Sequence, residues 1–220
     1  MVITSRYSQA LSWADELHRP QRRKGKPNVP YISHLIAVSA LVWEDGGDED
    51  QAIAALLHDA IEDAGVTQHQ IAAQFGERVG RMVADCTDTN GAVAAGGEKE
   101  PWILRKTRYV EHLQTVSLDS LLVTAADKAH NAQDMVLDAR RESDSWTRFN
   151  AGLDGTVWYL QQIHHTLNQR LPHSRSKERL GEALREMKGS EAFLCLVPAG
   201  VTAEAWADSY LERKTAASRG

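Results

Sequence analysis

Apolar residues recur at helical spacing along most of the chain. Near the N-terminus, Tyr7, Ala10 and Ala14 lie three or four positions apart, which places them on one face of a helix. The same spacing predicts helices over residues 5–18, 31–44, 49–63, 67–74, 77–87, 101–115, 119–138 and 145–170. Runs in which apolar and polar residues strictly alternate are scarce. We therefore predict an all-α fold, a bundle of helices.

The pattern changes towards the C-terminus. Residues 173–188 are mostly polar and predict an exposed helix, and residues 202–213 predict a last helix. Between them, the short apolar segment 191–199 indicates a strand or an extended packing segment. We therefore expect one domain over residues 1–170 and a short C-terminal extension of unknown role over residues 171–220.

Two glycine-containing segments interrupt the predicted helices. Residues 21–30 combine Gly25, Pro27 and Pro30 with a cluster of arginines and lysines, which is typical of a basic loop. Residues 89–100 are rich in glycine and alanine. We interpret the second segment as a loop, either a lid over a substrate or an insertion.

Composition narrows the class of protein. The chain has 220 residues, of which 42% are apolar, so it can bury a sizeable core and long disordered tracts are not expected. Asp plus Glu (30) exceeds Lys plus Arg (25), for a net charge of −5, which argues against a generally basic nucleic-acid-binding protein.

Two further features bear on the location of the protein. The sequence holds no apolar run of the roughly 20 residues that cross a bilayer, and no signal peptide is expected. The 2 cysteines indicate a reducing, cytoplasmic location. The oligomeric state stays open.

Charged and ionisable residues interrupt the apolar helix predicted over residues 49–63. His58 and Asp59 lie in its middle, and Glu62 and Asp63 follow one helical turn later. An ionised carboxylate inside an apolar helix is costly unless it is paired or bound to a metal. This single helix therefore presents an imidazole and three carboxylates in a small patch.

Two further polar residues lie in otherwise apolar helices. His34 occurs within PYISHLIAV and Asp127 within LLVTAADKAHN. A lone buried histidine is more often a hydrogen-bonded core residue than a ligand, so His34 alone decides nothing. Together with His58 and Asp59, however, these residues would surround a divalent cation. Nitrogen and oxygen ligands without a thiolate favour Mn²⁺, Fe²⁺, Mg²⁺ or Co²⁺ over structural zinc.

The order of these residues resembles the HD-domain metal phosphohydrolases. The wider sequence resembles the hydrolase domain of RelA/SpoT-type alarmone enzymes, and the chain is closest in size to the stand-alone small alarmone hydrolases. The resemblance covers about residues 10–165. The motifs that carry it are His18-x-x-Gln21-x-Arg23-Lys24, PYISH, AALLHDAIED, FGERV with a following TD, and AADKAHN.

The resemblance implies a fold, a cofactor and a reaction. The fold is an HD-domain helical bundle, and the usual ion of the family is Mn²⁺. The reaction is removal of the 3′-pyrophosphate from guanosine tetra- or pentaphosphate, which gives GDP or GTP. Residues after 170 are too few for a synthetase domain, so we expect the chain to degrade the alarmone and not to make it. The implied residues are His34, His58, Asp59 and Asp127 as metal ligands, Glu62 and Asp63 as catalytic carboxylates, and Arg23, Lys24 and Asn131 as nucleotide contacts.

Other interpretations stay open at this point. The chain either acts on another nucleotide, such as an adenosine alarmone, NADPH or a nucleoside monophosphate, or is a non-catalytic nucleotide-binding module. For Lys106 and its basic neighbours on the helix 101–115, we expect surface pairing rather than phosphate binding for most of them. Trp158 and Tyr159 are expected to be helix core rather than a wall for a purine. His130 is expected to orient a carboxylate from outside the metal ligands.

Overall fold

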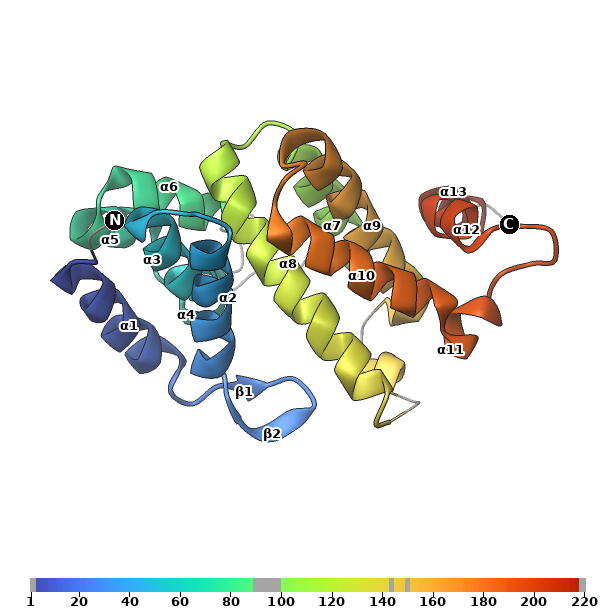
Figure 1. Ribbon diagram of the computed structural model, residues 1–220, viewed down its shortest axis with the longest axis horizontal. Helices are drawn as coiled ribbons and strands as arrows, with labels where there is room; N and C mark the ends of the chain where they lie inside the picture. Colours follow the sequence, from blue (N-terminus) through green and yellow to red (C-terminus); the bar gives the residue numbers. More distant parts are fainter. Residues whose placement is uncertain (1–2, 89–99, 143–144, 149–150, 218–220) are drawn as a thin grey trace.

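The computed structural model describes residues 3–88, 100–142, 145–148 and 151–217. In these ranges the chain is almost entirely helical, so the prediction of an all-α fold is confirmed (Figure 1). The helices are α1 (Ser5–His18), α2 (Ile32–Glu44), α3 (Glu49–Leu57), α4 (Ala60–Ala64), α5 (Gln68–Phe75), α6 (Glu77–Cys86), α7 (Trp102–His112), α8 (Leu118–Ala139), α9 (Gly152–Arg170), α10 (Arg175–Gly189), α11 (Glu191–Leu194), α12 (Ala203–Asp208) and α13 (Tyr210–Ala217). A 3₁₀ helix (Ser145–Arg148) precedes α9.

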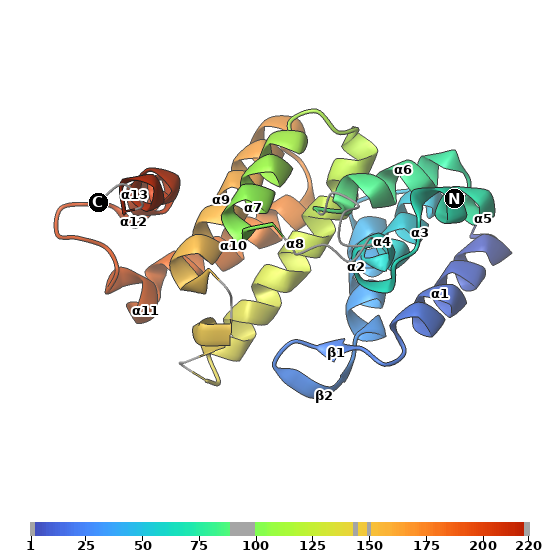
Figure 2. The same ribbon diagram turned by 180° about the vertical axis from the view of Figure 1, so that it is seen from behind.

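Helix α8 lies between two groups of helices (Figures 1 and 2). Helices α1–α6 pack on one side of it, and α7 and α9–α13 pack on the other. The sequence of α8 explains this position, because it has two apolar faces. Leu122, Val123 and Ala126 belong to the first core, whereas Leu121 and Ala125 belong to the second. A helix that is apolar on more than one side is expected to be central.

The helix predicted over residues 49–63 is interrupted. Helix α3 begins at a capping box formed by Asp48 and Gln51 and ends at Leu57, and α4 begins at Ala60. His58 and Asp59 therefore lie in the turn between the two helices. The backbone N–H of Asp63 still donates to the carbonyl of Asp59 over 2.8 Å, so the predicted spacing of one turn is kept.

The basic segment predicted as a loop is a small hairpin. Strand β1 (Arg22–Arg23) pairs in antiparallel fashion with β2 (Lys26–Pro30). Gly25 adopts a φ of 76° in the turn, a left-handed conformation that glycine favours. The two-residue strand β1 is too short to show period-two alternation, and β2 contains two prolines, which is why the sequence did not predict the hairpin. Of the second predicted loop, only Glu100 lies within the described residues.

Three expectations for the C-terminal segment are wrong. Helix α10 is not exposed along its length, because Leu180, Leu184 and Met187 lie on one face and enter the second core. The segment expected to be extended begins with the short helix α11, which the side chain of Ser190 caps by accepting from the N–H of Phe193. The last predicted helix is two helices, α12 and α13.

The C-terminal segment is also tied to the first group of helices. The carboxylate of Asp45, at the end of α2, accepts hydrogen bonds from the hydroxyl of Ser174 and the backbone N–H groups of Arg175 and Ser176. This carboxylate therefore caps the start of α10, where the helix dipole favours a negative charge.

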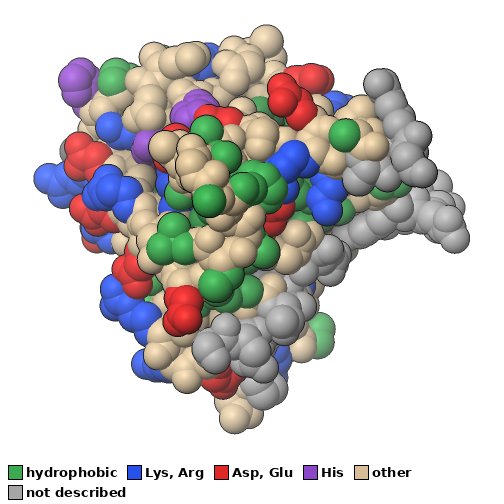
Figure 3. Space-filling model, turned by 90° about the vertical axis from the view of Figure 1, so that its right-hand side faces the viewer, with side chains coloured by type: hydrophobic (Ala, Val, Ile, Leu, Met, Phe, Trp, Pro, Cys, Tyr) green, Lys and Arg blue, Asp and Glu red, His purple; other side chains and the backbone are tan. Residues whose placement is uncertain are grey.

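The opposite end of the molecule, which carries α11–α13, presents a mixed surface. Hydrophobic side chains gather near the middle of this face and charged side chains lie around them (Figure 3), and Leu194 and Leu196 are among the exposed apolar residues of the chain. None of the described helices combines the length and the hydrophobicity that a membrane-spanning helix requires.

Candidate metal centre and nucleotide site

His58 is held by the turn in which it lies. Its Nδ1 is 2.8 Å from the carbonyl oxygen of Ala55, which can only accept, so Nδ1 carries the proton. Nε2 is then the nitrogen with a free lone pair in the neutral ring. It lies 2.9 Å from Oδ2 of Asp59 and 3.5 Å from Oδ1 of Asp127.

His34 and Asp127 complete a cluster of four side chains. His34 lies in the first turn of α2, and its Nε2 is 3.3 Å from Oδ1 of Asp127 and 3.9 Å from Oδ2 of Asp59. Asp127 lies in the middle of α8. The structure therefore brings together the four predicted metal ligands from α2, from the α3–α4 turn and from α8.

The donor atoms of this cluster fit a divalent cation. One ligand atom each from His34, His58 and Asp59 lie within 4.8 Å of one another, and Asp127 reaches both imidazoles. Ligands at about 2.1 Å from an ion are about 3 Å apart when they are neighbours and about 4.2 Å apart when they are opposite. Both Nε2 atoms are buried and have no hydrogen-bond partner among the described residues. In their neutral forms both rings direct a buried lone pair towards the two carboxylates, which is what a cation requires.

Electrostatics in the cluster also favours a positive charge. Burial opposes protonation of His58, but Asp59 and Asp127 outweigh it and raise its pKa well above the ordinary value. For Asp127, burial is outweighed by Lys128 and His58, which hold its pKa well below the usual range. Burial lowers the pKa of His34. The two carboxylates thus stay ionised and attract a cation.

Glu62 and Asp63 lie one turn beyond the cluster, in the first turn of α4. Glu62 is half-buried and Asp63 is exposed. The carboxylate of Asp63 is close enough to Tyr31 to contribute to its raised pKa, after burial, Asp59 and Asp127. The predicted catalytic carboxylates are therefore at the rim of the cluster, where solvent water reaches them.

The predicted nucleotide contacts lie on the hairpin and on α8. Arg23 donates from Nη2 to Oδ1 of Asn131 over 2.9 Å, and Asn131 in turn donates to Oδ1 of Asp127 over 2.5 Å. Lys24 and Asn131 line a cavity of about 230 Å³ beside the cluster. These three residues are therefore brought together next to the four candidate ligands.

Comparison with known proteins agrees with this geometry. The sequence profile described as the HD domain matches residues 10–149. The chain belongs to the HD-domain family. The chain is 36% identical over 129 residues to a guanosine-3′,5′-bis(diphosphate) 3′-pyrophosphohydrolase MESH1 of Xenopus tropicalis, covering 58% of this chain and 68% of that protein. It is 31% identical over 177 residues to the protein of the same name in Homo sapiens, covering 74% and 93%.

A solved structure extends the similarity to the fold of the HD domain. A protein described as a metazoan ortholog of SpoT that hydrolyzes ppGpp matches with a TM-score of 0.66 and 25% identity, covering 84% of this chain and 97% of that chain. The resemblance to HD-domain hydrolases that the sequence motifs indicated is confirmed.

Several contacts of the HD domain were not expected from the sequence. The hydroxyl of Tyr31 donates to Oδ2 of Asp59 over 2.6 Å, although Tyr31 stands within the motif PYISH. Nδ1 of His130 lies 2.9 Å from Nδ1 of His34, so the contact of His130 with the cluster is to a histidine, where a carboxylate was expected. Lys128 donates to Oδ2 of Asp127 over 2.5 Å. The first two contacts cross between elements, so no local pattern predicts them.

The basic residues of α7 divide between two environments. Arg108 is paired with Glu100 near the surface, as expected for a surface role. Arg105 and Lys106 instead bind the buried carboxylate of Asp88, and Lys106 lines the cavity beside the cluster.

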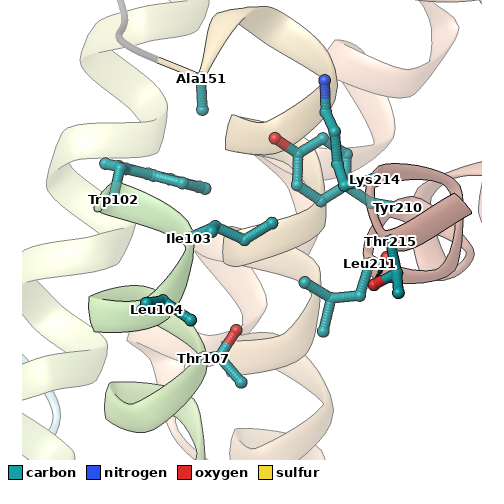
Figure 4. A pocket seen from close by; sticks show the side chains of 9 residues that line it. All are labelled: Trp102, Ile103, Leu104, Thr107, Ala151, Tyr210, Leu211, Lys214 and Thr215. Atoms are coloured by element: carbon teal, nitrogen blue, oxygen red, sulfur yellow. Dashed lines mark hydrogen bonds between the residues drawn. The ribbon is translucent and has the colours of Figure 1, made fainter. Parts of the chain in front are cut away.

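A larger cavity lies between α7 and α13. Its volume is about 600 Å³, and its lining side chains, which include Ile103, Leu104 and Leu211, are largely apolar (Figure 4). Lys214 points into it from α13. None of its lining residues is a histidine, cysteine or carboxylate. It therefore lacks the groups that metal-dependent hydrolysis needs.

Proposed function

We propose that this HD domain hydrolyses the 3′-diphosphate of guanosine tetraphosphate and pentaphosphate, releasing pyrophosphate and leaving GDP or GTP. The observation that carries the proposal is the convergence of His34, His58, Asp59 and Asp127 beside a cavity lined by lysines. The names of the relatives with 31% and 36% identity support the same substrate.

The proposed cofactor is one divalent cation held by those four residues. We favour Mn²⁺, while Mg²⁺, Fe²⁺ and Co²⁺ also suit nitrogen and oxygen ligands. When bound, such an ion polarises a phosphoryl oxygen and lowers the pKa of water. The contacts of Tyr31 with Asp59 and of His130 with His34 would fix the orientation of the ligands.

In the proposed reaction, a water oxygen attacks the phosphorus bonded to the ribose 3′ oxygen. Glu62 and Asp63 accept the proton of this water at their carboxylate oxygens. The bond between the phosphorus and the 3′ oxygen breaks, and the 3′ oxygen takes up a proton to become the hydroxyl of GDP. Arg23, Lys24 and Asn131 hold the nucleotide, because guanidinium, ammonium and amide groups all donate to phosphate or base acceptors.

We also propose that the hydrolase domain comprises residues 1–170 and that residues 171–220 form an extension that braces it. The cap that Asp45 provides to α10 and the packing of α10 on α8 support this role for the extension. We propose a cytoplasmic location and no nucleic-acid partner, in keeping with the excess of acidic residues.

A nucleotide panel tests the proposed function. Purified protein with Mn²⁺ is incubated separately with guanosine tetraphosphate, an adenosine alarmone, NADPH and a nucleoside monophosphate, and the products are separated by chromatography. We expect GDP and pyrophosphate from guanosine tetraphosphate, and none from the variant Asp59→Asn. Cleavage of another nucleotide instead would assign a different phosphohydrolase activity, and binding without any product would indicate a non-catalytic module.

A further inference from the structure

The 230 Å³ cavity beside the cluster is lined by four elements. Lys24 comes from the hairpin, Trp102 and Lys106 from α7, Asn131 from α8 and Tyr159 from α9. Pockets that hold a whole drug-sized molecule have volumes of about 300–1,000 Å³. The cavity therefore accommodates one portion of a nucleotide, and Asn131 joins it to the candidate metal ligand Asp127.

The polar groups around this cavity are mainly hydrogen-bond donors. Lys24, Lys106 and Lys128 all line it, and an ammonium group has three donors and no acceptor. Lys106 gives one hydrogen bond to Asp88, and Lys128 gives one to Asp127. The hydroxyl of Tyr159 is buried and has no hydrogen-bond partner among the described residues. A buried hydroxyl without a partner is costly, and the ammonium groups have donors only, so a ligand that supplies acceptors fits this cavity.

The ring of Tyr159 is not available for stacking on a base. Nζ of Lys106 lies 4.7 Å from the centre of the ring, and Nζ of Lys128 lies 5.9 Å from it. Ammonium groups at these distances are held by the electron-rich face of the aromatic ring. The cavity therefore presents positive charge beside the side chain of Tyr159, and positive charge fits the oxygens of phosphate groups.

We propose that Lys106, Lys128 and Tyr159 form a subsite that binds a diphosphate group of the nucleotide substrate, an inference that rests on the proposed function. Its ligand is either the 3′-diphosphate that departs as pyrophosphate or the 5′-diphosphate that stays on the nucleoside. Both have the same chemistry. Asp88 acts as a positioning residue for Lys106, because its carboxylate binds both Lys106 and the neighbouring Arg105.

Product binding tests this subsite without any turnover. Pyrophosphate and GDP are titrated separately into the Mn²⁺-loaded protein by calorimetry, for the wild type, Lys106→Gln and Tyr159→Phe. We expect Lys106→Gln to weaken the binding of one product by about tenfold or more, because it removes a charged hydrogen bond. We expect Tyr159→Phe, which removes only the hydroxyl, to weaken the same product by about threefold or more.

Two matched variants control for general effects on the fold. Arg108→Gln removes a charge two residues after Lys106 from a side chain that does not line the cavity. Tyr109→Phe removes a hydroxyl that bonds to Thr124 instead. Both should bind the two products within about twofold of the wild type. Met135→Glu is a further probe, because it places a carboxylate in the cavity and keeps Lys106 and Asp88 paired. It should weaken diphosphate binding even if Lys106→Gln fails to fold.

The pattern of losses identifies the ligand. Loss of pyrophosphate binding alone assigns the subsite to the departing 3′-diphosphate, and loss of GDP binding alone assigns it to the 5′-diphosphate. The inference is overturned if Lys106→Gln, Tyr159→Phe and Met135→Glu all bind both products as the wild type does. That result would leave the proposed function standing if guanosine tetraphosphate is still hydrolysed. Conversely, weakened diphosphate binding by a protein that hydrolyses no guanosine tetraphosphate would support the subsite and remove the proposed function.

Discussion

The helices on the two sides of α8 contribute different chemistry to the site. The first group, α1–α6, supplies the imidazoles and carboxylates of His34, His58 and Asp59, which suit a cation. The second group supplies Lys106 and Tyr159, which suit an anion. Helix α8 contributes to both groups of side chains with two adjacent residues: Asp127 belongs to the cluster of candidate metal ligands, and Lys128 lines the cavity. A metal-dependent phosphate hydrolase needs both kinds of group, and here they meet at a single helix.

The largest expected effect is on kcat, from replacing Glu62 and Asp63, which lie one turn beyond the cluster of candidate metal ligands. Replacing both Glu62→Gln and Asp63→Asn should lower kcat for guanosine tetraphosphate by about 10²- to 10⁴-fold, because no carboxylate remains to accept the proton of water. Mn²⁺ binding should be nearly unchanged. Steady-state kinetics and metal analysis of the same preparation measure both quantities.

A matched pair of acidic residues controls for this double substitution. Asp15→Asn with Glu16→Gln removes two adjacent charges from α1, far along the chain from the motif and on its outer surface. This control should keep the wild-type kcat. A near-normal kcat in the Glu62 and Asp63 double variant would remove these residues from the proposed chemistry.

The next effect is on thermal stability, at the contact between α2 of the first group of helices and α10 of the second group. Asp45→Ala removes the carboxylate that caps α10, so the start of this helix loses three hydrogen bonds. Loss of a cap costs about 1–2 kcal/mol, which should lower the Tm by about 2–8 °C for a chain of this size. Thermal unfolding followed by circular dichroism measures the shift. Glu44→Gln, which breaks only an exposed pair with Arg179, should change the Tm by less. Equal shifts for the two variants would contradict the bracing role.

A smaller effect is expected where the hairpin meets α8. Asp134 accepts from Arg23 over 3.0 Å and from Lys26 over 2.8 Å. Asp134→Asn should release Arg23 and raise KM by about three- to tenfold with kcat nearly unchanged, because Arg23 is proposed to bind the nucleotide and not to take part in the chemistry. Asp138→Asn, which removes only a contact of Lys26, is the control. A fall in kcat without a rise in KM would contradict this assignment.

The smallest effect is a pH dependence on the second side. Burial raises the pKa of Asp88, but Lys106 and Arg105 outweigh it, and the pKa lies below the ordinary value of 3.8. The pairing therefore stabilises the fold above about pH 4, and this stabilisation is lost as the pH falls and the carboxylate is protonated. The difference in Tm between the wild type and Asp88→Asn should be constant at higher pH and should shrink as the pH falls below about 4. A difference that grows on acidification would contradict the pairing.

The sequence predicted the first side of the molecule better than the second. The candidate ligands His58 and Asp59 are adjacent in the chain, and His34 and Asp127 each interrupt an apolar helix, so a linear pattern reveals them. Tyr159 gave no such signal. It was expected to be helix core, and it is buried, but its side chain also lines a cavity built from four separate elements.

The errors in the fold have a common physical cause. A short apolar run such as residues 191–199 does not distinguish a strand from a buried helix, and here the cap at Ser190 decides for a helix. Helix α10 was expected to be exposed because most of its residues are polar, yet Leu180 and Leu184 suffice to bury one face. Which face of a helix meets a neighbour depends on tertiary packing, which the local sequence does not contain.

Titration of Mn²⁺ into the protein tests most directly whether Asp127 of α8 and the candidate ligands of the first group of helices form one cation site. Calorimetry is performed on the wild type, on Asp59→Asn from the first side and on Asp127→Asn from α8. We predict one ion per chain for the wild type and an affinity at least about tenfold weaker for each variant, because each loses a ligand that the other side cannot replace. Binding of Mn²⁺ by Asp127→Asn with the wild-type affinity would contradict the account, and so would a wild-type protein that binds no ion.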